Sequence, residues 1–312
     1  MRKLIIGGLT ILAVAIIAAI FIYELRGDGY VLITNEPSHI ERNMDINVMH
    51  PFEENGLWGL FCPFTGKIFM EPQFAWAGLS SSSVGLAFVK GVEGNEHQTG
   101  YVDSEGNLII HLPEISTGHG FSEGLAFVRG TEGREDLTGF IDLEGNLVIP
   151  LPMVSVGHGF SEGLAFVRGI EGREDLTGYI DLEGNLAIPL PTAILARQFS
   201  HGFAIVIVRE WNRETENPNI IGTSGPFIFI DREGNNAFGQ EFQSAFDFVD
   251  GLARVSPYRG AMFFMNTTGR NAFRREFEFA FEFEGNYAEV TLLDGTAARI
   301  NRSGRIVRRG LP

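Results

Sequence analysis

Cysteine is nearly absent from this sequence of 312 residues. The single cysteine, Cys62, excludes an intrachain disulfide, and we interpret it as a small buried apolar side chain. Positive charge is scarce as well, because 24 Lys and Arg face 39 Asp and Glu, for a formal net charge of −15. An acidic surface repels phosphate backbones, so nucleic acid is not expected as a partner.

The usual sequence signatures of catalysis and metal binding are also missing. The chain has no Gly-x-Ser-x-Gly elbow, no glycine-rich phosphate loop and no Cys-x-x-Cys pair. None of its seven histidines forms a His-x-His or His-Glu-x-x-His spacing, and His119 and His158 are copies of one another in Gly-His-Gly turns. We therefore expect no metal, no cofactor and no enzymatic activity.

One long apolar run stands at the N-terminus. Leu4 to Tyr23 carries no charge and is long enough to cross a hydrocarbon core of about 30 Å, and Arg2 and Lys3 precede it. Bulky residues end the run where a signal peptidase needs small ones, which favours an uncleaved anchor over a cleaved signal peptide. We predict a transmembrane anchor over residues 1–25, a linker and cap over 26–56, and an extracytoplasmic repeat domain over 57–312.

Self-comparison reveals the repeats. The segment from His119 to Pro152 recurs from His158 to Pro191 with three changes, which gives a period of 39 residues. Weaker copies extend in both directions, marked by a turn glycine that steps by 40, 39, 39, 50, 35 and 35 residues. The step of 50 contains an insertion, residues 209–225, which we interpret as an enlarged loop. The series of turn glycines is Gly66, Gly106, Gly145, Gly184, Gly234, Gly269 and Gly304.

Each unit is predicted to hold three short antiparallel strands. In the unit that begins at Gly163 these are residues 163–168, 177–181 and 186–189. A helix is not expected, because glycine recurs about every eight residues and proline closes each unit.

The turn between the last two strands has the pattern Asp-x-Glu-Gly-Asn. We interpret it as hairpin chemistry: the aspartate accepts hydrogen bonds from backbone N–H groups two residues on, and the glycine supplies a positive φ. A shared Ca²⁺ loop is the alternative, although further oxygen ligands are missing from the pattern. The predicted turn residues are Asp103, Gly106, Asp142, Gly145, Asp181, Gly184, Asp231 and Gly234.

These marks resemble the WG-repeat family. Trp58-Gly59 opens the first unit, and two later units carry aromatic and alanine residues at three-residue steps. The first set of steps precedes Asp250-Gly251-Leu252-Ala253. The resemblance covers most of residues 57–312, although units two to four have Gly-Tyr or Gly-Phe in place of Trp-Gly. It implies a β-repeat assembly of unassigned biochemical role. The three-residue steps are Phe242, Ala245 and Phe248, then Phe277, Ala280 and Phe283.

The second of these segments has two interpretations. Alternation of Phe and Glu from Phe277 to Glu284 suggests a half-buried strand, whereas the family register buries Phe277, Ala280 and Phe283 in a connecting segment. We favour the family register because the earlier unit has the same steps.

The predicted fold is all-β: about six to seven units of short antiparallel strands that stack into a propeller-like or solenoid array. Closure into a ring stays open. For function, we expect a non-catalytic binding or scaffold module for a protein or an envelope polymer; the alternative is a propeller-type hydrolase or lyase with acids in a central channel. The residues expected to contact the partner are Trp211, Arg213 and Asn217 in the insertion, and Arg134 and Arg173 in two acidic loops.

Overall fold

The structure is a computed structural model that describes residues 48–79, 84–208 and 226–309. The chain divides into two compact units, residues 1–44 and 45–312, and all the described residues belong to the second unit. The predicted anchor and the insertion with Trp211, Arg213 and Asn217 fall outside the described residues. Within the described ranges, no helix has the length and apolar character needed to cross a membrane.

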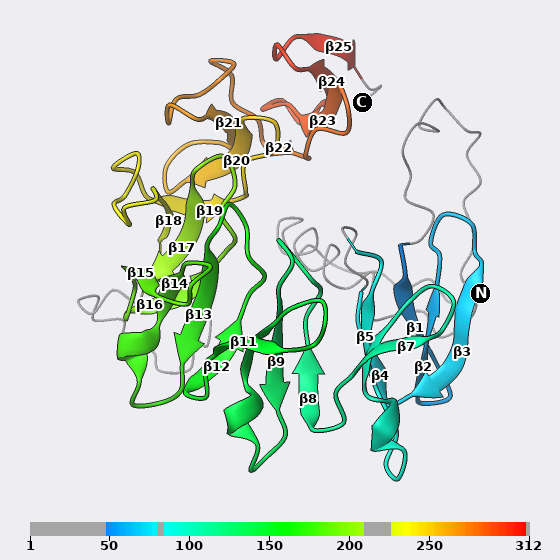
Figure 1. Cartoon of the computed structure of the whole chain (residues 1–312). Helices are drawn as coiled ribbons and strands as arrows, with labels where there is room; N and C mark the ends of the chain where they lie inside the picture. Colours follow the sequence, from blue (N-terminus) through cyan, green and yellow to red (C-terminus); the bar gives the residue numbers. More distant parts are fainter. Residues whose placement is uncertain (1–47, 80–83, 209–225, 310–312) are drawn as a thin grey trace, which may run out of the picture. The chain divides into compact units, whose positions relative to one another are not determined.

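The described chain is all-β and antiparallel, with short strands in six sheets (Figure 1). Within the described residues, helix is confined to three 3₁₀ turns of three residues, η1 (Glu96–Gln98), η2 (Glu135–Leu137) and η3 (Glu174–Leu176). The first sheet in chain order contains β1 (His50–Glu54), β2 (Leu57–Phe61) and β3 (Ile68–Phe74). The second sheet contains β4 (Trp76–Ala77), β5 (Ala87–Lys90), β6 (Gly100–Val102) and β7 (Leu108–His111). The third sheet contains β8 (Ile115–Gly118), β9 (Ala126–Gly130), β10 (Gly139–Ile141) and β11 (Leu147–Pro150).

The later sheets repeat the same meander. One contains β12 (Val154–Gly157), β13 (Ala165–Gly169), β14 (Gly178–Ile180) and β15 (Leu186–Pro189). A six-stranded sheet joins two units through the pair Phe227–Phe242 and contains β16 (Ala193–Ala196), β17 (Ala204–Val208), β18 (Phe227–Ile230), β19 (Phe242–Ala245), β20 (Leu252–Pro257) and β21 (Phe263–Asn266). The last contains β22 (Phe279–Ala280), β23 (Tyr287–Thr291), β24 (Ala297–Asn301) and β25 (Ile306–Arg309). β1, which lies in the segment predicted as linker and cap, pairs with β2.

The prediction of three strands per unit was wrong for four of the sheets, which have four strands each. The missed strand comes first, as in β8, and pairs with β9 through a register shift between Ile115 and Thr117. This bulge lets residues three apart face the same side, so that Ile115 and Gly118 are both buried. The aromatic-x-x-alanine pattern therefore belongs to a bulged strand, whose period is neither two nor that of a helix.

The same geometry decides between the two interpretations of Phe277 to Glu284. Phe277 and Ala280 are fully buried, Phe283 packs against the same cluster, and Phe281 is 58% exposed. The family register is confirmed and the alternating strand is wrong.

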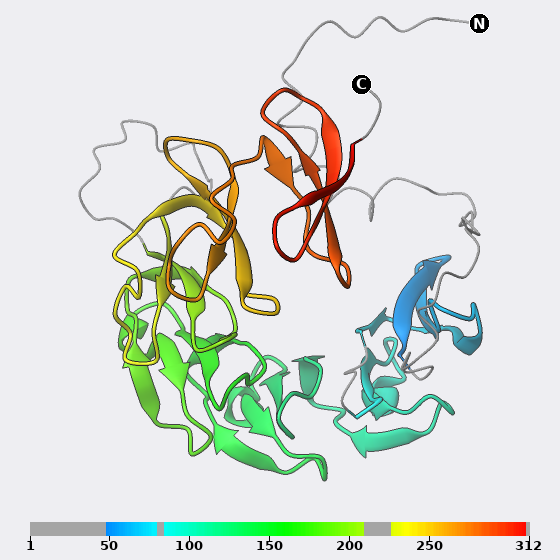
Figure 2. The ribbon, with the colours of Figure 1, turned by 90° about the horizontal axis from the view of Figure 1, so that it is seen from above.

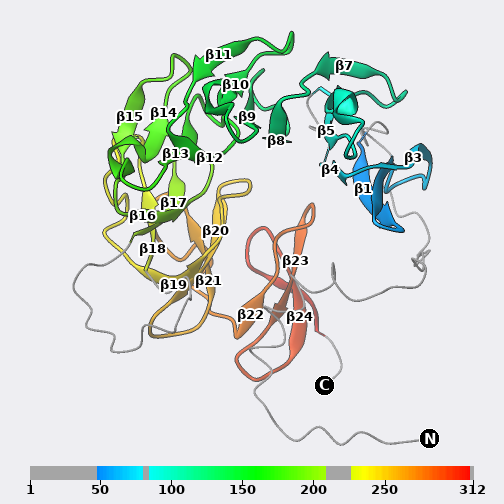
Figure 3. The ribbon, with the colours of Figure 1, turned by 90° about the horizontal axis from the view of Figure 1, so that it is seen from below.

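The core is divided among the boundaries between units. Each cluster of buried side chains combines strands of two consecutive units; one cluster, for example, joins Phe140 and Ile149 of one unit to Phe160 and Ile180 of the next. Consecutive units are also locked by hydrogen bonds, such as the one that Ser122 Oγ donates to the Phe160 carbonyl at 2.5 Å. Figures 2 and 3 show these neighbouring sheets side by side in chain order. Neighbours therefore stabilise one another, as expected of repeats too small to fold alone.

Candidate functional site

Each of three consecutive sheets has an acidic loop between its two central strands. These loops, residues 91–99, 130–138 and 169–177, connect β5 to β6, β9 to β10 and β13 to β14, and each contains one 3₁₀ turn (Figure 1). Because the same two strands flank each loop, all three leave their sheets at the same end. We call them the acidic loops.

A buried threonine fixes the base of every acidic loop. Thr138 is 2% exposed, and its Oγ1 accepts a hydrogen bond from the N–H of Gly130 at 3.2 Å. Thr99 and Thr177 accept the same bond from Gly91 and Gly169, at 3.0 and 3.1 Å. A fixed base means that a partner does not have to order the loop on binding, which lowers the entropic cost of the contact.

Glycine is required at these bases for steric reasons. A Cβ on Gly130 would lie 1.8 Å from the carbonyl oxygen of Arg134, and a Cβ on Gly169 would lie 1.8 Å from that of Arg173. Both φ angles are outside the positive region. The close approach of the backbone therefore selects glycine here.

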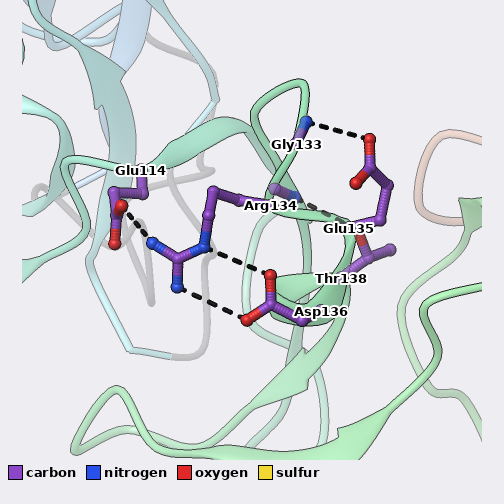
Figure 4. Close-up of polar contacts among 7 residues, drawn as sticks. Glu114, Gly133, Arg134, Glu135, Asp136 and Thr138 are labelled. Carbon is purple, nitrogen blue, oxygen red and sulfur yellow. Dashed lines mark hydrogen bonds and ion pairs between the residues drawn. The ribbon is translucent and has the colours of Figure 1, made fainter.

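The carboxylates of these loops are held by their own backbone and by arginine. The Glu135 carboxylate accepts a hydrogen bond from the N–H of Gly133 at 3.1 Å. Hydrogen bonds from its own backbone N–H and from that of Gly133 lower the pKa of Glu135. Arg134 donates from Nε and Nη2 to the two oxygens of Asp136, at 3.2 and 3.4 Å, and this lowers the pKa of Asp136 (Figure 4). These acids are exposed and ionised, in contrast with a general acid, whose pKa must be raised.

Arg134 and Arg173, the two arginines predicted to contact the partner, differ in how much of the guanidinium group is bound to carboxylates. Arg134 also reaches Glu114, which lies just before β8 (Figure 4). Arg173 binds Asp175 in the same forked way, at 3.0 and 3.1 Å, but the position that corresponds to Glu114 is Met153. Arg173 is thus the one with a guanidinium edge not engaged by a second carboxylate. Side-chain exposures of 35% and 38% leave both arginines accessible, and their partner contact remains a prediction.

The Asp-x-Glu-Gly-Asn turns have the predicted chemistry. Asp142 Oδ1 accepts hydrogen bonds from the N–H groups of Glu144 and Asn146, at 3.1 and 2.8 Å, and Oδ2 accepts one from Asn146 Nδ2 at 3.0 Å. Gly145 has φ +85°. The amide of Asn146, followed by backbone N–H groups, lowers the pKa of Asp142. The same bonds recur at Asp103, Asp181 and Asp231.

Both oxygens of each turn aspartate are thus engaged in their own turn. Across the described part of the chain, no group of three or more His, Cys, Asp or Glu is arranged to hold a metal ion. Cys62 is fully buried, as its apolar interpretation predicted.

The sequence interpretation missed a second polar feature, a row of His119, His158 and Arg197 at one residue after β8, β12 and β16. The sequence shows the two histidines only as copies of one another in Gly-His-Gly turns. The available signal was the spacing, because Arg197 follows His158 by the same 39 residues that separate the histidines.

Comparisons with known proteins agree with the repeat assignment. The family model of the WG containing repeat matches residues 100–129, 139–172, 229–256 and 262–295. Among solved structures, the chain is similar to the computationally designed protein Ika8, with 12% identity over 84% of this chain and 85% of that one and a TM-score of 0.44. It is also similar to BamB from Moraxella catarrhalis, with 13% identity, coverage of 86% and 89%, and a TM-score of 0.39. No curated protein matches this chain in sequence.

Proposed function

Because the chain carries WG containing repeats at four places, we propose that it is a non-catalytic binding module for a protein or an envelope polymer. It is held at the membrane by residues 4–23, with the repeats on the extracytoplasmic side. The acidic loops are the contact surface, together with the insertion at 209–225.

The observation that carries this proposal is the repetition of one preorganised loop in three consecutive units. Each loop has the same threonine-bonded base, the same 3₁₀ turn and the same carboxylate on a backbone N–H. Repeated loops of one shape suit a partner that contacts several of them at once. A catalytic pair would instead need two carboxyls in unlike environments.

The binding surface is tested by recovery of partners from detergent-solubilised membranes with the tagged full-length chain. We expect a defined set of proteins or polymers that is lost when Arg173 is changed to Ala. The matched control is Arg232→Ala. Arg232 Nη1 lies 3.6 Å from Oε2 of Glu162, and Glu162 belongs to the turn between β12 and β13, outside the acidic loops. Equal recovery by the wild type and Arg173→Ala would contradict the proposed surface.

Topology is tested separately with a membrane-impermeant maleimide on intact cells. Cys62 is fully buried, so the wild-type chain is a low-background control. A cysteine at the exposed position Glu183 should be labelled from outside without permeabilisation. Labelling only after permeabilisation would contradict the extracytoplasmic placement.

A further inference from the structure

Consecutive units are joined by one repeated hydrogen bond at the turn between their first two strands. The residue before the glycine of this turn has positive φ, +52° at Glu123, +54° at Glu162 and +56° at His201. Its side chain accepts a hydrogen bond from the N–H of the corresponding glycine in the next unit. The three pairs are Glu123 with Gly163 at 2.9 Å, Glu162 with Gly202 at 2.9 Å, and His201 with Gly251 at 3.1 Å.

The third of these bonds differs from the other two because its acceptor is an imidazole. Ser200 Oγ donates its single proton to the Phe248 carbonyl at 2.7 Å. It therefore accepts the proton of His201 Nδ1, which lies 3.0 Å away. Nε2 of the same ring faces the N–H of Gly251, which can only donate, so Nε2 carries no proton. The bond to Gly251 thus requires a neutral imidazole.

A second proton on His201 removes this bond. The proton would lie on Nε2 and point at the N–H of Gly251, so that two donors would face each other. The side chain is exposed, so protons reach it from solvent. Imidazole changes its charge between about pH 5 and pH 8, whereas carboxylates stay ionised in this range. Of the three equivalent bonds, the one at His201 is therefore the one that responds to mild acid.

The charged groups that surround His201 are engaged with one another. They come from the preceding unit, from its own unit and from the next one. In the part of the chain that the structure describes, no ion pair joins His201 to a carboxylate, so a charged imidazole gains no partner in place of Gly251. The surrounding pairs are Glu162 with Arg232 at 3.6 Å, Asp247 with Arg197 at 3.1 Å, and Asp250 with Arg302 at 2.6 Å.

We infer that His201 makes the joint between the unit of β16–β18 and the unit of β19–β21 sensitive to acid. These two units share only one strand pair within the described residues, Phe227–Phe242, so contacts at their turns help to hold them together. Near neutral pH, His201 holds the N–H of Gly251. Once the imidazole takes up a second proton, this N–H loses its acceptor, and the turn of residues 249–252 opens more often.

Such a joint gives the array a local response to pH. The turns held by Glu123 and Glu162 keep their acceptors, so the change is confined to one boundary of the array. Protonation of a histidine at an interface between two packed parts is a common way for a protein to change their contacts in mild acid. The array can therefore loosen at one place without unfolding.

The test is hydrogen exchange of the full-length chain in detergent, resolved to single amides by mass spectrometry with electron-transfer fragmentation. Rates are corrected for the intrinsic pH dependence of amide exchange. The protection of the Gly251 N–H should fall by about tenfold from near pH 7.5 to near pH 5.5, the size expected for one lost hydrogen bond. The N–H groups of Gly163 and Gly202 are internal references and should keep their protection.

One substitution separates the imidazole from the rest of the joint. His201→Glu introduces the acceptor that the two preceding units use, and Glu123 and Glu162 have the same positive φ. In this variant the N–H of Gly251 should be equally protected near both pH values. The matched control is His111→Gln, which removes an exposed histidine of β7 and should show the same fall as the wild type.

The outcomes are decisive in either direction. Equal protection of the Gly251 N–H near both pH values in the wild type would overturn the inference, as would an undiminished fall in His201→Glu. A fall of the same size at Gly163 and Gly202 would overturn it as well, because acid would then act on the whole array. Melting temperatures within a few degrees of wild type ensure that the variants are folded.

Discussion

Replacing Gly145 by alanine should destabilise the chain through two separable effects. Gly145 has φ +85°, where a residue with a Cβ is strained by about 1–2 kcal/mol. Its Cβ would also lie 2.6 Å from Cγ2 of Ile110, in β7 of the preceding unit. Overpacking of this kind costs about 1–3 kcal/mol more. We therefore expect a loss of about 2–5 kcal/mol in the free energy of unfolding.

Gly124 is the matched control. Its φ is +83°, almost the same as that of Gly145, but a Cβ there would meet no atom within 4 Å. Gly124→Ala should therefore cost only the backbone strain, about 1–2 kcal/mol. Urea denaturation followed by circular dichroism measures both losses, and the difference between them isolates the contact between units.

A second variant tests the cause of the clash. Ile110→Leu removes the methyl group on Cβ that a new Cβ at Gly145 would approach. In the Ile110→Leu background, the extra cost of Gly145→Ala over Gly124→Ala should shrink. Equal losses for the two glycine variants in the wild-type chain would refute the assigned packing between the units.

Three further outcomes are expected. Tyr179→Phe removes the hydrogen bond that Tyr179 donates to the Arg197 carbonyl of the next unit at 2.5 Å, and should lower the free energy of unfolding by about 1 kcal/mol; no loss would contradict that bond. Asp142→Asn should cost less than Asp142→Ala in thermal melts, since asparagine keeps one acceptor oxygen; added Ca²⁺ that raised the melting temperature by many degrees only in the presence of Asp142 would favour a cation loop instead. Because the folded state lowers the pKa values of His119 and His158, the unfolded chain binds more protons, so stability should fall as the pH drops below about 6.5, and His119→Gln/His158→Gln should flatten that slope.

Much of the local structure can be predicted from short stretches of sequence. The Asp-x-Glu-Gly-Asn turns are predictable because all their hydrogen bonds lie within four residues; the aspartate, glycine and asparagine supply the acceptor, the positive φ and the donor. The glycines that open the next strand follow the same logic. Gly124 and Glu123 both have positive φ, which is the requirement of a tight hairpin turn.

The first strand of a four-stranded unit, such as β8, was not predictable in this way. Its pattern of buried residues three apart is neither that of a flat strand nor that of a helix, and a bulge opposite β9 is what reconciles it. A bulge depends on the partner strand, so the first strand alone does not reveal it.

By itself, the sequence determined the repeat period, the all-β class and the turn chemistry, because each depends on residues close together in the chain. Only the tertiary structure decided which side chains share a surface. His119, His158 and Arg197 are 39 residues apart in sequence and line one hollow because consecutive units stack. For the same reason Ser122 Oγ donates a hydrogen bond to the carbonyl of Phe160, 38 positions away. Contacts at that separation arise from the packing of buried aromatic side chains between units, which no single unit contains.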